Sequence, residues 1–214
     1  MSILDERPAW ERRFEHFLEG SAGGDVAHDL AHIRRVVAGA VALAQAEQAD
    51  LAVVLPAAWL HDCVVVPKDS PLRAQASTLA GRAAVDFLRP LGYPAEHLPA
   101  IRHAIEAHSF SAQIRPRTRE AMVVQDADRL DSLGAIGIAR CLMLSGQLGR
   151  RLYDPGEPFP LARAPDDTRN TIDHFYVKLL RLAEQMNTDA GRAEALRRTE
   201  FMRAFLDQLG HELP

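Results

Sequence analysis

Histidine and aspartate side chains gather in four short segments of a 214-residue chain that holds nine histidines. Imidazole nitrogens and carboxylate oxygens bind divalent metals, and imidazoles also transfer protons near neutral pH. The residue types therefore indicate a metal centre, an acid–base site or both. The four segments are His28-Asp29-Leu30-Ala31-His32, His61-Asp62, His103 with His108, and Asp126-Ala127-Asp128-Arg129-Leu130-Asp131.

The first segment places two histidines on one side of a predicted helix. His28 and His32 are four residues apart, so their imidazoles would share a helical face and could share a metal ion or a phosphate. A pair of surface or half-buried histidines fits the same spacing. The pair alone does not decide between these two interpretations.

Two other segments put carboxylates directly after apolar runs. His61-Asp62 follows Leu55–Leu60, and a charged carboxylate at the edge of a core is costly unless it is paired or bound to metal. The alternative is a histidine favoured by the helix dipole beside a capping aspartate. Three aspartates also follow Ala121–Val124, where a cation or Arg129 could offset their repulsion, or where they could form a solvated helix end.

Together the four segments form an ordered histidine, histidine–aspartate, aspartate series. This series resembles the HD-domain superfamily of metal-dependent phosphohydrolases, over about residues 25 to 185. The chain is also similar to small stand-alone bacterial HD hydrolases, some of which act on nucleoside triphosphates. The residues that match the metal ligands of the family are His32, His61, Asp62 and Asp128.

The resemblance implies one divalent metal ion as the cofactor. Mixed nitrogen and hard-oxygen donors suit Mn²⁺ first, with Mg²⁺, Co²⁺, Ni²⁺ and Fe²⁺ as alternatives. Zn²⁺ more often prefers sulfur or more imidazole among four ligands. A second ion is less expected, because the spacing of five between His103 and His108 departs from the adjacent histidines of binuclear members.

Further roles are assigned around the ion. Asp62, His108 and His28 are expected to be catalytic, with a histidine moving a proton to the leaving group. A phosphate ester also needs cationic partners, although each candidate could equally be an ordinary surface side chain. The expected phosphate-binding residues are Lys68, Arg73, Arg35 and His103.

The function expected from these residues is divalent-metal-dependent hydrolysis of a small phosphorylated metabolite, first of all a nucleoside mono- or triphosphate, by attack of metal-activated water on phosphorus. One alternative is a non-catalytic, regulatory HD module that binds a nucleotide. Another is a zinc-dependent peptidase that uses His28 and His32, although Asp29 is shorter than the glutamate of that motif.

The elements that must position these residues are helices. Apolar residues recur every three or four positions through most of the chain, and no alternating pattern persists. The prediction is an all-α, compact HD-domain bundle with a central metal site. Residues 1–214 would form a single domain, with a motif core at 25–185 and a C-terminal helix, 186–214, packed on it. The predicted helices are 25–48, 51–62, 72–91, 94–108, 117–127, 132–146, 166–186 and 189–209, and an ordered loop next to the site is predicted for 149–165.

Composition limits the other possibilities. A formal net charge of −4 gives no footprint of a nucleic-acid polymer. The chain has no apolar run of about 18 residues that would span a membrane, and its two cysteines suit a reducing compartment. We therefore expect a cytoplasmic protein whose partner is a small phosphorylated molecule, without nucleic acid or membrane, and the sequence leaves a homodimer open.

Overall fold

The computed structural model describes residues 6–21, 30–67 and 70–213. Two residues with predicted roles, His28 and Lys68, lie outside these ranges. The chain folds into two compact units, Met1–Asp128 and Arg129–Pro214, and each is described by itself. The single domain expected from the sequence stays a prediction.

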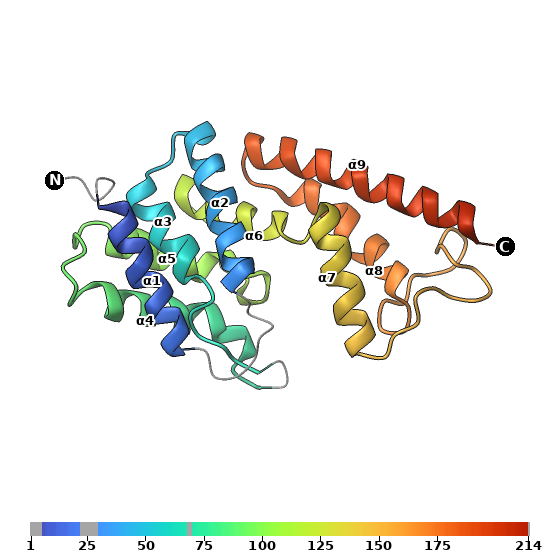
Figure 1. Ribbon diagram of the computed structural model, residues 1–214, viewed down its shortest axis with the longest axis horizontal. Helices are drawn as coiled ribbons and strands as arrows, with labels where there is room; N and C mark the ends of the chain where they lie inside the picture. Colours follow the sequence, from blue (N-terminus) through green and yellow to red (C-terminus); the bar gives the residue numbers. More distant parts are fainter. Residues whose placement is uncertain (1–5, 22–29, 68–69, 214) are drawn as a thin grey trace. The chain divides into compact units, whose positions relative to one another are not determined.

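Helices build both units (Figure 1). The described residues contain no strand, and the predicted all-α fold is confirmed. The first unit contains α1 (Arg7–Ser21), α2 (Leu30–Glu47), α3 (Leu51–Leu60), the 3₁₀ turn η1 (Arg73–Gln75), α4 (Ala76–Leu88), α5 (Leu98–His108), η2 (Phe110–Ala112) and most of α6 (Arg119–Leu130). The second unit contains α7 (Gly134–Gln147), α8 (Thr171–Val177), η3 (Leu179–Gln185) and α9 (Asp189–Glu212).

Helix α3 is the centre of the first unit, where it packs against α1, α2, α4 and α5. All of its residues from Val53 to Leu60 are buried. Asp50 caps its start, because the side chain accepts a hydrogen bond of 2.8 Å from the Ala52 N–H. The helix also contains Pro56, which cannot donate to the Ala52 carbonyl. The Tyr93 hydroxyl donates to that carbonyl instead, at 2.5 Å, so the helix continues to the site without an unpaired carbonyl there.

The second unit is organised around α9, the long red helix of Figure 1. Helix α9 packs against α7 and η3, and α8 packs against α7 and η3. Thr188 caps the start of α9, because its side chain accepts a hydrogen bond of 3.0 Å from the Gly191 N–H. Buried Ala195, Met202 and Leu206 lie along one side of α9 and contribute to this core.

Several elements differ from the sequence-based expectation. The predicted helices include none at residues 7–21, where α1 forms, and α5 begins at Leu98 rather than near residue 94. The helix expected at 166–186 starts only at Thr171 and continues as η3. Asp166 explains the late start, because its side chain accepts from both the N–H and the hydroxyl of Thr168 and so forms a turn in place of helix.

The proline-rich segment at 149–165 is ordered, as predicted. The Asp154 carboxylate accepts hydrogen bonds from the N–H groups of Gly156 and Glu157, at 2.9 and 3.2 Å. The Glu157 carboxylate in turn accepts from the N–H groups of Leu161 and Ala162, at 3.0 and 2.7 Å. Side chains thus satisfy the backbone of a loop that forms no helix. Its expected position next to the site stays a prediction.

Candidate metal centre

The candidate site lies in the first unit, at the carboxyl ends of three helices. His61 follows the last residue of α3, His108 is the last residue of α5, and Asp128 lies in the last turn of α6. The carboxyl end of a helix carries partial negative charge, so three such ends favour a cation. Helix α2 adds His32, which is buried.

Backbone carbonyls fix the orientation of two of the imidazoles. The Nδ1 atom of His61 lies 2.8 Å from the Ala58 carbonyl oxygen, and Nδ1 of His108 lies 2.6 Å from the Ile105 carbonyl oxygen. A carbonyl only accepts, so each Nδ1 carries the proton, and in the neutral ring Nε2 has the free lone pair. This is the arrangement that orients histidines for metal binding.

The Nε2 atoms converge on two carboxylates. Nε2 of His32 and of His61 lie 3.5 and 3.9 Å from Oδ1 of Asp128. Nε2 of His61 also lies 3.6 Å from Oδ2 of Asp62, and Nε2 of His108 lies 3.4 Å from its Oδ1. Within the described residues, two overlapping groups therefore have the spacing of metal ligands: His32, His61 and Asp128, and His61, Asp62 and His108.

Burial makes His61 a suitable ligand. The residue is fully buried, and its Nε2 has no hydrogen-bond partner within the part of the chain that the structure describes. Burial lowers the pKa of this imidazole, although Asp62 acts in the opposite direction, so the ring stays neutral at pH 7. A buried, neutral nitrogen that faces two carboxylates fits a divalent ion, which would satisfy the lone pair.

His108 has a different electrostatic balance. Burial alone would lower its pKa, but the hydrogen bond and the negative charge of Asp62 outweigh burial and raise it. The two histidines that face Asp62 therefore differ in their preference for a proton. His61 is suited to donate a lone pair, and His108 is suited to donate a hydrogen bond.

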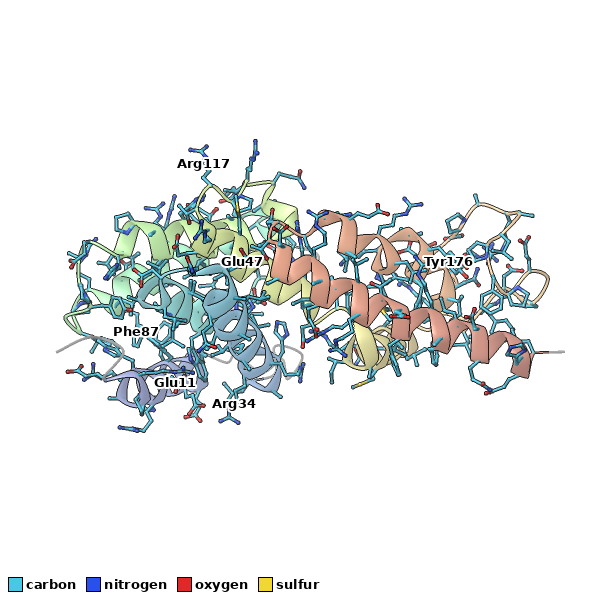
Figure 2. All side chains as sticks on the ribbon, turned by 90° about the horizontal axis from the view of Figure 1, so that it is seen from above. Glu11, Arg34, Glu47, Phe87, Arg117 and Tyr176 are labelled. Carbon is cyan, nitrogen blue, oxygen red and sulfur yellow. The ribbon has the colours of Figure 1, made fainter. Side chains whose placement is uncertain are left out.

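The structure brings together five of the predicted residues, and His103 is not among them. The cluster is formed by His32, His61, Asp62, His108 and Asp128. The Nε2 atom of His103, on α5, accepts a hydrogen bond of 3.0 Å from the Arg117 N–H. Figure 2 shows the Arg117 side chain extending outward from the first unit. The predicted contact of His103 with phosphate stays a prediction.

The two described arginine candidates are half-buried, and both remain predictions as phosphate ligands. Nη1 of Arg73 donates to the Val66 carbonyl at 2.9 Å, which ties η1 to the segment after the His61-Asp62 pair. Arg35 lies on α2, next to Arg34, which is paired with Glu15 of α1 at 3.0 Å and extends outward in Figure 2.

Neighbours of the expected ligands have structural partners. Cys63 is buried, its Sγ lies 3.5 Å from the Ala80 carbonyl, and burial raises the pKa of the thiol to about 12, so it is an inert core residue. In the second unit, Asp131 pairs with Arg140. Sequence reasoning gave no role to Gln125, a buried amide whose Nε2 donates to the Ala107 carbonyl at 2.7 Å. A polar residue directly after the apolar run at 121–124 was the available signal.

Comparison with known proteins shows the family to which this chain belongs. The model of the HD-domain family matches residues 29–133, which include His32, His61, Asp62 and Asp128. The chain belongs to the HD-domain family, as the sequence predicted, and has the fold of HD-superfamily hydrolases.

Particular relatives span nearly the whole chain. YpgQ of Bacillus subtilis strain 168, an uncharacterized protein, is 36% identical over 191 residues, which cover 87% of this chain and 85% of YpgQ. A crystal structure of YpgQ in complex with ADP matches with a TM-score of 0.71 and 34% identity, over 95% of this chain and 96% of YpgQ. An HD-superfamily hydrolase from Bacillus thuringiensis matches with a TM-score of 0.73 and 34% identity, over 97% of each chain. Among the described residues of this chain, no helix is long and apolar enough to cross a membrane.

Proposed function

We propose that this protein is a divalent-metal-dependent phosphohydrolase that acts on a small phosphorylated metabolite, first of all a nucleoside mono- or triphosphate. The observation that carries the proposal is the convergence of three buried imidazoles on Asp62 and Asp128 at the carboxyl ends of α3, α5 and α6. The relative YpgQ has been crystallised with ADP, which supports a nucleotide as the substrate.

His32, His61, Asp62 and Asp128 would hold the ion, with Mn²⁺ as the preferred metal. Two nitrogen and two oxygen donors from the chain would suit such an ion, which could also bind oxygen atoms of water and phosphate. A bound divalent ion supplies a Lewis acid, which lowers the pKa of water and neutralises phosphate charge. One ion is proposed, because an imidazole nitrogen binds a single metal and both ligand groups contain His61.

His108 would face the substrate. Its Nδ1 proton is held by the Ile105 carbonyl, so only Nε2 is directed towards Asp62 and the site. A proton on Nε2 can be donated to a phosphoryl oxygen or to the leaving oxygen of the ester. Phosphate binding is proposed for Arg35, Arg73, Lys68 and His103, and proton transfer is proposed for His28.

A substrate panel tests this function. Purified protein is incubated with nucleoside mono-, di- and triphosphates and Mn²⁺, and the products are separated to identify the bond that breaks. We expect turnover of at least one nucleotide and its loss when a chelator removes the metal. Tight binding without turnover would favour the regulatory module instead. Cleavage of casein, but not of nucleotides, would favour the peptidase.

The Asp62→Asn variant provides the matched test of the ligand set. The amide keeps the shape of the side chain but removes the charge that faces both imidazoles, so we expect kcat/KM to fall by roughly 100-fold or more, as when one major electrostatic contact is lost. Asp86→Asn is the control, because Asp86 is an exposed residue of α4 in the same unit. Full activity of Asp62→Asn would refute the proposed metal site.

A further inference from the structure

We propose that Gln125 is a positioning residue, which holds the helix that carries Asp128 against the helix that carries His108 and thereby sets the metal-ligand geometry. The inference rests on the proposed metal site and adds a residue that contacts neither metal nor substrate.

The carboxyl end of α5 has carbonyl groups that need hydrogen-bond partners from side chains. The last four carbonyls of an α-helix have no partner within the helix, and buried carbonyls need one. Here three of them are satisfied by side chains. The Ile105 carbonyl accepts from His108, the Glu106 carbonyl accepts from Ser77 of α4 at 3.0 Å, and the Ala107 carbonyl accepts from Gln125 of α6 at 2.7 Å. The end of α5 is thus fixed from two neighbouring helices.

The Gln125 bond connects two ligand-bearing segments. Its acceptor, Ala107, directly precedes His108, and Gln125 lies three residues before Asp128 on α6. Residues three apart are neighbours on one side of a helix, so a shift of Gln125 moves the Asp128 carboxylate with it. Asp128 has 3.5 and 3.9 Å contacts to the imidazoles of His32 and His61, which a displacement of α6 would change directly.

Because both partners are buried, the hydrogen bond between Gln125 and the Ala107 carbonyl restricts the position of α6 relative to α5. Gln125 is 4% exposed and Ala107 is fully buried. A buried amide is expensive unless it is hydrogen-bonded, so the pairing disfavours positions of α6 that separate the amide from the carbonyl. An apolar side chain of the same length would fill the space but would tolerate such shifts.

Two variants separate positioning from general stabilisation. Gln125→Met removes the donor with little change in volume and leaves the Ala107 carbonyl without that partner. Ser77→Ala is the control, because it removes a bond of the same kind from the neighbouring Glu106 carbonyl but ties α4, rather than α6, to α5. The Mn²⁺ dissociation constant is measured by calorimetry or by electron paramagnetic resonance, and the melting temperature of each metal-free protein is measured in parallel.

We expect both variants to lower the melting temperature of the metal-free protein to a similar extent. Only Gln125→Met should weaken Mn²⁺ binding, by about tenfold, the lower end of the range for residues that support metal ligands. If Mn²⁺ binds the wild type, and Gln125→Met either keeps wild-type affinity or loses no more than Ser77→Ala, the positioning role is wrong. If the wild type binds no Mn²⁺, the proposed metal site fails and this inference fails with it.

Discussion

Hydrogen bonds to two backbone carbonyls determine which imidazole nitrogen faces the candidate site. His61 and His108 both donate Nδ1–H to the carbonyl three residues earlier, which leaves Nε2 to face Asp62. The sequence predicted that His32, His61, Asp62 and Asp128 lie together, because the order of histidines and aspartates resembles a known family. It did not predict the tautomers, since these depend on carbonyls left free at helix ends, and it gave no role to the buried amide of Gln125.

Binding of Mn²⁺ should stabilise the protein in a pH-dependent way. At a free concentration of about 100 times the dissociation constant, a ligand that binds only the folded state adds about 2.7 kcal/mol to the free energy of unfolding. A ligating imidazole must be neutral, so the gain should shrink as the pH falls from 7 to 5. Because burial lowers the pKa of His61, the part of this loss that comes from His61 should begin at a more acidic pH than it would for an exposed histidine.

Thermal unfolding with and without Mn²⁺, compared at each pH, measures this gain and cancels the pH dependence of the metal-free protein. His61→Gln removes one proposed ligand and should abolish the gain at every pH. A gain that is the same at pH 5 and pH 7, or that survives in His61→Gln, would contradict the ligand assignment.

At the scale of elements, the sequence predicted the helices better than their ends. Apolar periodicity located the core helices from α2 onward but not α1, and the late start of α8 depends on polar contacts that periodicity does not reveal. Asp173, fully buried in α8, accepts two hydrogen bonds from Arg163, at 2.6 and 2.7 Å, and another from the Asp166 N–H at 2.6 Å. These bonds join the proline-rich loop and the following turn to α8.

Asp173→Asn should therefore destabilise the second unit at neutral pH. Asp173 is fully buried, whereas the Arg163 side chain is 21% exposed, so loss of this charged, hydrogen-bonded pair should cost about 1 to 3 kcal/mol. Burial alone would raise the pKa of Asp173, but the hydrogen bonds from Arg163 and Asp166 outweigh it and lower the pKa below its usual 3.8. A carboxyl group with a lowered pKa stabilises the folded state above 3.8, and this stabilisation is lost as the pH falls below 3.8 through the folded-state pKa.

Denaturant unfolding at pH 7 and at pH 3 checks both parts of this expectation. The difference in the free energy of unfolding between wild type and Asp173→Asn should be large at pH 7 and smaller at pH 3. Asp167→Asn is the control, because Asp167 pairs with His174 through a side chain that is 29% exposed, and such pairs contribute little. Equal effects of the two substitutions at pH 7 would show that burial of the Asp173 carboxylate is unimportant.

At the scale of the whole molecule, length and the absence of a linker-like composition led to the prediction of a single domain. The structure divides into two compact units, and α6 runs across the boundary between them, from Arg119 to Leu130. Sequence patterns show which residues are apolar but not which core each one joins, so they do not show where a compact unit begins or ends, and the single domain stays a prediction. The described members of the proposed ligand set all lie in the first unit, and Asp128 is its last residue.

Hydrogen exchange in the presence of Mn²⁺ can show whether the two units open together. A ligand slows exchange only for amides whose opening also disrupts its site. Because the proposed ligands lie in one unit, we expect Mn²⁺ to slow exchange at the carboxyl ends of α3, α5 and α6 and to leave amides in the middle of α9 unchanged. Slowing of equal size throughout α9 would contradict this expectation, because it would mean that the second unit unfolds only together with the metal site, as a single cooperative domain requires.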